Sequence, residues 1–296
     1  MSIAGAVRAK PPVSLQEALH KHLKRTDIER PPWRLHGSSI TRQEKAFCGR
    51  EVLIKHKLGK RDTEHVATSM AVTWRWGRMV ESEVRRLFAE MGMAVGDWQC
   101  TYTKCKHVVR WSKQPAECPK CGGERFTYEE LRAISPYSGI GCGLDLLLNR
   151  GEPKLTLVEV KSIDKDKFAD LKGPLGEHKL RMQLYLRCIA ESGQPELEKI
   201  NTQRGVVLYV TKGGYGTMVD NSAWKDAVKE KFSPFKEYPV ERMDKDTDAL
   251  VEAARATKLA LEGKGPVPER ICATYGVKRA QVCSVVGPCF KAGDSW

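Results

Sequence analysis

Two carboxylates and one amine stand at the same end of a predicted β-hairpin, where they could bind a metal ion. The residues are Asp145, Glu159 and Lys161, and most of their neighbours are Leu or Val. Oxygen ligands of this kind suit Mg²⁺, which takes one or two carboxylates and keeps several of its waters. A bound Mg²⁺ can orient a phosphodiester, activate water and stabilise the charge that develops on the phosphate. The three residues therefore indicate phosphodiester hydrolysis.

The hairpin that must position them consists of two segments rich in Leu and Val, 143–149 and 155–162, joined by a loop with Gly and Pro. If the residues flanking the loop pair with each other, the antiparallel register places Asp145 opposite Glu159, about 5 Å apart. Lys161 shares the face of Glu159, because side chains alternate along a strand. Like charges so close on an apolar hairpin repel unless a cation joins them. The alternative is a surface hairpin with a solvated acidic and basic pair.

A zinc-ribbon pattern precedes the hairpin, at residues 98–126. It has two cysteine pairs, the second in the sequence Cys-Pro-Lys-Cys-Gly-Gly: Cys100, Cys105, Cys118 and Cys121. Four thiolates bind Zn²⁺ tetrahedrally at about 2.3 Å and close the site to chemistry. His107 is an alternative ligand, because the first pair is more widely spaced than usual. So short a segment has too little core to fold alone, so the metal would supply its stability.

The role of this predicted ribbon is open between two options. It could bind DNA, or it could be only a protruding insert stabilised by its metal ion. The candidates for DNA contact are Lys104, Lys106, Arg110 and Trp111.

Asp145 and the run Glu159-Val160-Lys161 resemble the D…(D/E)-x-K signature of the PD-(D/E)XK nuclease superfamily, above all its RecB-like and phage exonuclease branches. The proline of the family name is absent, and Leu144 precedes the aspartate, as is common in the RecB branch. The resemblance implies a restriction-endonuclease-like α/β core (mixed α+β), with a mixed central sheet flanked by helices. It also implies that Asp145, Glu159 and the Val160 carbonyl bind Mg²⁺ or Mn²⁺, while Lys161 aligns the attacking water.

A helical glutamate adds to this resemblance. Gly77-x-x-x-Glu81, in a segment predicted to be helical over 62–91, resembles the G-x-x-x-E pattern of the phage exonuclease branch. It implies that Glu81 is a further carboxylate ligand of the catalytic metal. Glu83 is its competitor on the same helix.

A glutamine downstream completes the resemblance to the RecB-like nucleases. Gln183, on a helix predicted over about 177–191, resembles the Gln of their next motif, which implies that it orients Lys161 or the phosphate. That motif has a Tyr four residues after the Gln, where this chain has Arg187. Tyr185 is therefore interpreted as a core aromatic residue.

A second set of cysteines resembles the ligands of iron–sulfur nucleases in the RecB-like group, including those of CRISPR adaptation. In these, one cysteine precedes the nuclease core and three follow it, as do Cys48, Cys272, Cys283 and Cys289 here. The resemblance implies a structural [4Fe–4S] cluster that ties the two ends of the core together. The last spacing matches the family, whereas ten residues separate Cys272 from Cys283 instead of two. Zinc, or no metal at all, is the alternative.

The composition favours a polyanionic partner. The 296 residues contain 50 Lys and Arg against 37 Asp and Glu, a net charge of +13, which most often indicates nucleic acid. No apolar run approaches the roughly 20 residues of a membrane span, and the N-terminus lacks the core of a signal peptide. We therefore expect a cytoplasmic protein without membrane contact. No phosphate-loop pattern occurs, so a helicase or recombinase working with it would be a separate protein.

The expected organisation is a basic N-terminal arm, 1–37, and a nuclease domain, 38–296. The domain contains the zinc-ribbon insert and ends in a cysteine segment, 264–296. Thr41 and Glu44 form a capping-box pattern that predicts a helix starting at that point and running to residue 57.

These features predict a metal-dependent DNA exonuclease in recombination, repair or DNA processing, whose compact single-chain form leans toward a phage origin. A structure-selective or restriction-type endonuclease would use the same residues. A non-catalytic, zinc-ribbon nucleic-acid-binding protein with a decayed core is the alternative of another class. The presence of Asp145, Glu159 and Lys161 argues against decay.

Overall fold

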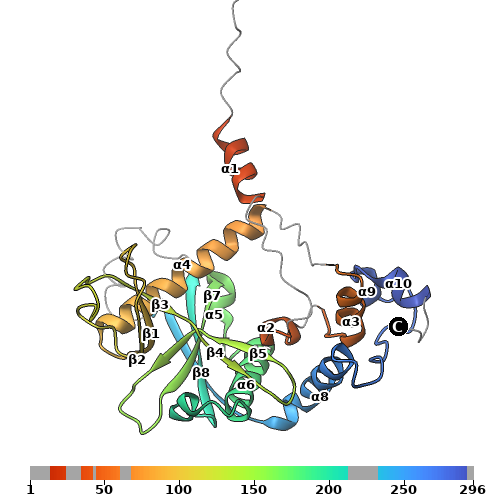
Figure 1. Ribbon diagram of the computed structural model, residues 1–296. Coiled ribbons are helices and arrows are strands. Elements are labelled where there is room, and N and C mark those ends of the chain that lie inside the picture. The colour runs from red at the N-terminus through yellow and green to blue at the C-terminus, as the bar shows by residue number, and fades with distance from the viewer. Residues whose placement is uncertain (1–13, 25–34, 43–44, 61–67, 213–232, 292–296) are drawn as a thin grey trace, which may run out of the picture.

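A seven-stranded sheet forms the centre of the molecule (Figure 1). The computed structural model describes residues 14–24, 35–42, 45–60, 68–212 and 233–291. The main path of the sheet has the order β2-β1-β6-β7-β8-β9, and β3 pairs with β1 beside it, while β4 and β5 form a separate pair. The strands are β1 Ala94–Cys100, β2 Val108–Ser112, β3 Phe126–Glu129, β4 Leu131–Ile134, β5 Gly141–Leu144, β6 Leu146–Leu148, β7 Thr156–Asp164, β8 Arg204–Lys212 and β9 Phe235–Glu241.

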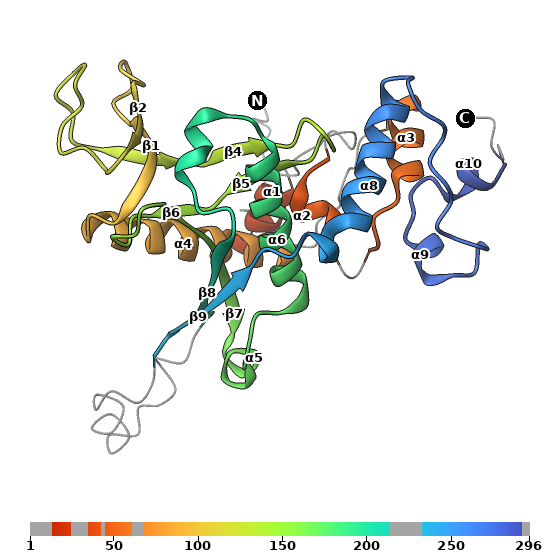
Figure 2. The same cartoon turned by 90° about the horizontal axis from the view of Figure 1, so that it is seen from below.

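Helices flank the sheet. The helices are α1 Leu15–Lys24, α2 Gly37–Ile40, α3 Gly49–Lys57, α4 Thr68–Glu90, α5 Lys165–Asp170, α6 Gly176–Glu191, the 3₁₀ helix η1 Pro195–Lys199, α8 Asp244–Leu261, α9 Lys278–Gln281 and α10 Val286–Lys291. The ribbon strands β1 and β2 lie at the opposite end of the molecule from α9 and α10 (Figures 1 and 2). No helix in the described ranges is long and apolar enough to cross a membrane.

The sheet is mixed. β7 and β8 are parallel and are joined by a crossover through α5, α6 and η1, whereas β6 and β7, like β8 and β9, are antiparallel. This architecture confirms the predicted α/β class with a mixed central sheet between helices. It also confirms the hairpin register over the paired residues, because Leu146 pairs with Val158 and Leu148 with Thr156. Asp145 directly precedes Leu146.

The alternation of side chains along β7 divides the core into two halves. Val158 and Val160 belong to the cluster under α4, whereas Leu157 packs in the larger cluster under α6. Glu159 and Lys161 therefore share the α6 side of the sheet. Because β7 is central, both carry their charge at the boundary of a buried core.

β1 belongs to the core and to the cysteine ribbon at once. Its first residues, Ala94 and Val95, pair with β6, and its later residues pair with both β2 and β3. The ribbon thus extends the central sheet, and the segment 98–126 begins within β1, a strand that also pairs with β6 of the core. Gly96 is required at this place, because a Cβ there would lie 2.4 Å from the ring of Tyr128.

The helix predicted to begin at Thr41 begins eight residues later, so the capping-box prediction is wrong. Thr41 follows α2, and its hydroxyl donates a hydrogen bond to the carbonyl of Gly37 at 3.1 Å. The side chain is thus engaged with the turn before it, and α3 starts at Gly49 after Cys48. Glu44 lies outside the described residues.

The predicted N-terminal arm is described in part. Within 1–37, the structure describes residues 14–24, which include α1, and residues 35–37 at the start of α2. α1 packs against α4. The predicted helix over 62–91 is described as α4 from Thr68 to Glu90, and it ends before Gly92, whose φ of 67° suits glycine.

Candidate metal centre and cysteine sites

Asp145 lies where β7 loses its neighbour β6. The two strands pair only as far as Leu146 and Val158, so the edge of β7 beyond that point is free of a described strand on this side. The Asp145 carboxylate takes this place, because its Oδ2 accepts a hydrogen bond of 3.1 Å from the N–H of Val160. The N–H and C=O of one residue point to the same side of a strand. The Val160 carbonyl therefore points into the site as well.

Glu159 binds two cations through one oxygen. The residue is 2% exposed, and its Oε1 lies 2.6 Å from Nζ of Lys161 and 3.4 Å from Nη1 of Arg181. Its other oxygen, Oε2, is buried and lacks a hydrogen-bond partner among the described residues. Since buried polar atoms are normally paired, this oxygen is an available ligand atom for a metal ion.

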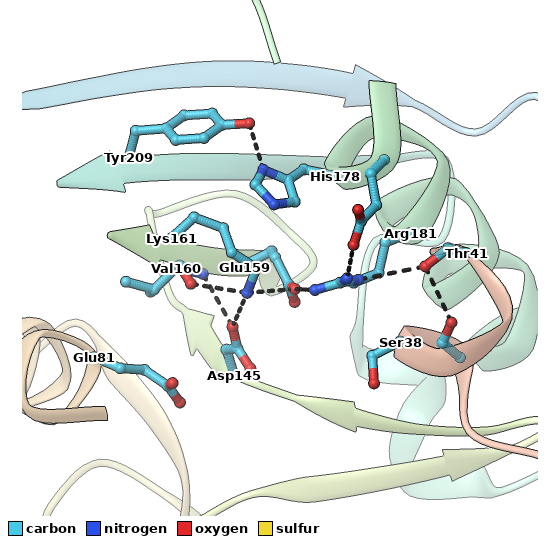
Figure 3. Close-up of polar contacts among 12 residues, drawn as sticks. Ser38, Thr41, Glu81, Asp145, Glu159, Val160, Lys161, His178, Arg181 and Tyr209 are labelled. Atoms are coloured by element: carbon cyan, nitrogen blue, oxygen red, sulfur yellow. Dashed lines mark hydrogen bonds and ion pairs between the residues drawn. The ribbon is translucent and has the colours of Figure 1, made fainter. Parts of the chain in front are cut away.

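Lys161 connects the two carboxylates (Figure 3). Its Nζ lies 3.4 Å from Oδ2 of Asp145 and donates a hydrogen bond of 2.9 Å to the Val160 carbonyl. Burial works against the charged amine, but Asp145 and Glu159 raise the pKa of Lys161 above its ordinary value. Burial and the charge of Glu159 also raise the pKa of Asp145 to about 6. The site therefore favours binding of positive charge beside Asp145.

Glu81 approaches Asp145 from α4, together with Glu130, which the sequence analysis missed. One oxygen from each of the three carboxylates lies within 4.8 Å of the others. Burial and the charge of Asp145 raise the pKa of Glu81 to about 7. Glu130 reaches this group because β4 pairs with β5 as Leu131 with Leu144, a register that places Glu130 opposite Asp145.

The competing helical carboxylate, Glu83, faces elsewhere. It pairs with Arg86 at 2.6 Å, and both side chains are exposed. Of the two glutamates, Glu81 is therefore the one that the fold brings to the hairpin.

Gln183 does not lie in the site, contrary to the role expected for it. The residue is 1% exposed, and its Nε2 donates a hydrogen bond of 3.0 Å to Asp246 of α8. Successive helical residues are about 100° apart, so residue 183 lies nearly opposite residue 181 on α6. The face that meets Glu159 carries Arg181 instead.

Arg181, Tyr185 and His178 form that face, and the sequence analysis gave none of them a role in the site. Arg181 reaches Glu159 and also lies 3.5 Å from Oγ1 of Thr41. The signal was the four-residue spacing of Arg181 and Tyr185, which matches the spacing expected for the Gln and Tyr of the motif. Tyr185 is buried, as interpreted, but it lies beside Glu159; burial and that charge raise its pKa well above the ordinary value.

His178 is held in its neutral form next to Lys161 (Figure 3). Its Nδ1 lies 2.7 Å from the hydroxyl of Tyr209, which also accepts a hydrogen bond of 2.9 Å from the N–H of Leu175. Burial, together with the charges of Lys161 and Arg181, lowers the pKa of His178 to about 3. An uncharged imidazole thus forms one wall of the site.

The four cysteines of the ribbon meet at one point. Their sulfurs lie within 4.8 Å of one another, and the pairs Cys100–Cys121 and Cys105–Cys118 are each 3.7 Å apart. Ligands about 2.3 Å from a tetrahedral Zn²⁺ are about 3.8 Å from each other. The set therefore has the spacing of a single tetrahedral metal ion. His107 is not part of this group, and its carbonyl accepts a hydrogen bond from the N–H of Cys100.

The residues proposed for DNA contact on the ribbon differ in availability. Lys104, Lys106 and Arg110 are exposed, as DNA contact requires. Trp111 is half-buried against the core, and Nζ of Lys199 lies 5.5 Å from the centre of its ring. The tryptophan is therefore a packing residue.

The second cysteine set converges from both ends of the described chain. Four thiols line one cavity next to α3: Cys48, Cys272, Cys283 and Cys289. They are not among the described groups whose ligand atoms all lie within 4.8 Å of one another, so they are spread more widely than the ribbon thiols. A four-iron cluster binds each thiolate through a different iron, which requires a wider set than one ion does.

The surroundings of this cavity also suit an anionic metal–thiolate group. Arg270 lines it, and the Nε of that residue is buried without a hydrogen-bond partner in the described structure. Arg279 lines it too and forms an ion pair with Glu51 of α3, which Lys55 contacts at 2.6 Å. Burial opposes ionisation of Glu51, but these cations lower its pKa to about 2. An ion pair thus connects the C-terminal segment to α3.

Comparisons with known proteins give similarity at the level of solved structures. No protein-family model matches the chain, and no curated protein matches its sequence. The fold is similar to that of an alkaline exonuclease, LHK-Exo from Laribacter hongkongensis, with 12% identity and a TM-score of 0.43 over 82% of this chain and 93% of that one. LHK-Exo in complex with dAMP gives 13% identity and 0.43 over 79% and 90%, and SSO0001 gives 13% and 0.39 over 83% and 85%. Because each TM-score is below 0.5, the roles of the residues above rest on their own geometry.

Proposed function

We propose that this protein is a divalent-metal-dependent deoxyribonuclease of the PD-(D/E)XK type that hydrolyses phosphodiester bonds. The observation that carries the proposal is the arrangement at the free edge of β7. There, Nζ of Lys161 lies within 3.4 Å of Asp145, Glu159 and the Val160 carbonyl. Each of the four was expected in this role from the sequence alone.

The donor set fits Mg²⁺ or Mn²⁺. Asp145 and Glu159 would supply carboxylate oxygens, including the unpartnered Oε2 of Glu159, and Val160 would supply its carbonyl. When bound there, the ion would supply the positive charge that activates water and stabilises the pentacovalent phosphate. Glu81 and Glu130 would add negative charge beside this position.

The protein's own cations then have defined roles. Lys161, which is held protonated between the two carboxylates, would donate hydrogen bonds to the attacking water and to a phosphate oxygen. Arg181 would keep Glu159 in place and offer its remaining N–H groups to the substrate backbone, since a guanidinium has five donors.

Exonucleolytic cleavage of DNA, in recombination, repair or processing, is the form of the activity that we propose. The exposed cations Lys104, Lys106 and Arg110 on the ribbon would bind the backbone away from the site. The ribbon thiols would hold Zn²⁺, and the four converging thiols a structural [4Fe–4S] cluster. A helicase or recombinase, where one takes part, would be a separate chain.

Digestion of end-labelled linear DNA and of closed circular DNA tests this proposal. Wild-type protein, purified anaerobically, should degrade linear DNA only with Mg²⁺ or Mn²⁺ and leave the closed circle intact. Lys161→Ala should abolish the activity, whereas Lys154→Ala, an exposed lysine in the loop of the same hairpin, should retain it. Cleavage of the circle would establish an endonuclease instead, and binding without any cleavage would establish a non-catalytic nucleic-acid-binding protein.

A further inference from the structure

A half-buried arginine lies among the carboxylates of the candidate metal centre. Arg85 lies one helical turn after Glu81 on α4, and its side chain is 14% exposed. Its Nη2 forms an ion pair with Glu81 and lies 3.0 Å from Oε1 of Glu130. Its Nε donates a hydrogen bond of 2.8 Å to the main-chain carbonyl of Asp145. One guanidinium therefore binds all three residues of this carboxylate group.

The surroundings of Arg85 fix it in this position. Its guanidinium carbon lies 5.3 Å from the centre of the Tyr128 ring, close enough for a cation–π interaction. Tyr128 is itself buried, packs edge-on against Trp98 and donates a hydrogen bond to the carbonyl of Val95. An arginine cannot lose its proton in a protein, so the positive charge at this point is permanent.

The two sides of Asp145 are therefore unlike. On the β7 side, Glu159 keeps an unpartnered buried oxygen, and the Val160 carbonyl is contacted only by the amine of Lys161 among the bonds that the structure shows. On the α4 side, the carboxylates of Glu81 and Glu130 already share a cation, which has planar geometry and several partners. Carboxylates so close together need a cation, and Arg85 meets that need without a metal ion.

We propose that Arg85 is a built-in counter-cation of Glu81 and Glu130, and that the centre consequently binds one divalent ion, at Asp145, Glu159 and the Val160 carbonyl, instead of two. The inference rests on the proposed metal-dependent function and adds to it the number of ions. It also changes the role expected for Glu81, which becomes the residue that holds Arg85 in place.

Mn²⁺ titration followed by electron paramagnetic resonance counts the ions directly, in protein that retains its cysteine-bound metals. Wild-type protein should bind one Mn²⁺ that is lost in Asp145→Asn. Arg85→Gln should bind two, because Glu81 and Glu130 are then left without their cation. Arg86→Gln, which removes the neighbouring exposed arginine that pairs with Glu83 and Glu90, should still bind one.

A second variant keeps the test decisive if Arg85→Gln does not fold, as judged by circular dichroism. Glu81→Gln should leave the count at one if Glu81 holds Arg85, and should abolish Mn²⁺ binding if Glu81 is an essential ligand of the bound ion. Two ions in the wild-type protein, or a single ion in folded Arg85→Gln, would overturn this inference and leave the proposed function standing. Failure of the wild-type protein to bind any Mn²⁺ would overturn the proposed function along with it.

Discussion

The carboxylate of Asp145 accepts a hydrogen bond from the backbone N–H of Val160 and so occupies the place of a missing strand beside β7. One side chain thereby has two roles, because it satisfies a main-chain donor and places its charge in the candidate metal centre. These roles can be separated by substitution.

Asp145→Asn should fold normally and lose nuclease activity by more than about a hundredfold, because the amide oxygen can still accept the Val160 hydrogen bond but a charged metal ligand is gone. Asp145→Ala should be inactive and also less stable by about 1–3 kcal/mol, since it leaves the donor unpaired. Urea unfolding and DNA cleavage of both variants check this. Equal stability of the two variants would show that the hydrogen bond contributes nothing.

Arg181 and Gln183 should respond to substitution in opposite ways. Arg181→Gln removes a cation from Glu159 and should lower kcat at least about tenfold, or about 1.4 kcal/mol. Gln183→Leu breaks the hydrogen bond to Asp246 and should cost about 1–3 kcal/mol of stability while leaving the cleavage rate per folded molecule unchanged. Cleavage assays at equal folded concentration distinguish the two effects. Loss of kcat in Gln183→Leu would restore the role that the motif suggested.

The contrast between these residues shows how far the sequence could lead. The hairpin register was predictable, because pairing the two residues that flank the loop, Asn149 and Leu155, fixes every later pair and aligns Asp145 with Glu159. Gln183 was misplaced because the motif was matched by residue type, whereas position on a helix is set by the angle about its axis. Arg181, two residues earlier, occupies the position beside Glu159 that was expected for Gln183.

Other features depended on contacts between distant segments. Glu130 reaches the centre only because β4 pairs with β5, and nothing local to it predicts that pairing. The Thr41 pattern was typical of a helix start, but the hydroxyl bonds to the turn before it, and the next helix begins only after Cys48. Local signals specified elements well and their boundaries poorly.

The folded protein should lose stability as the pH falls below 6.5, in part through His178. Its pKa is about 3 in the folded state against an ordinary value of 6.5. Between these two pH values the imidazole is protonated in the unfolded state and neutral in the folded state. The stability is therefore fully present above pH 6.5 and lost toward pH 3, by at most about 1.4 kcal/mol for each pH unit.

Urea unfolding at pH 7 and pH 5.5 measures this effect. His178→Gln should lose less stability over that interval than the wild-type protein, and the exposed His22→Gln should behave like wild type. Parallel losses in wild type and His178→Gln would mean that the imidazole is protonated in the folded state.

The two cysteine sets should lose their metals independently. Cys118→Ser should release the zinc, so that the protein retains about four iron atoms and little zinc. Cys272→Ser should bleach the absorbance near 400 nm and leave about one zinc per chain. Metal analysis of anaerobically purified variants measures both. Zinc in place of iron at the second set in the wild-type protein would contradict the cluster assignment.

Cys48 lies directly before α3, whereas the other three thiols that line the same cavity all lie beyond α8. During synthesis, the hairpin with Asp145 and Glu159 therefore leaves the ribosome well before the second cysteine set can be completed. The four ribbon cysteines, all between residues 100 and 121, are thus synthesised early, whereas the second set is complete only once Cys289 has emerged. The positions of the two cysteine sets in the chain thus fix the order in which their thiols become available, with the ribbon first.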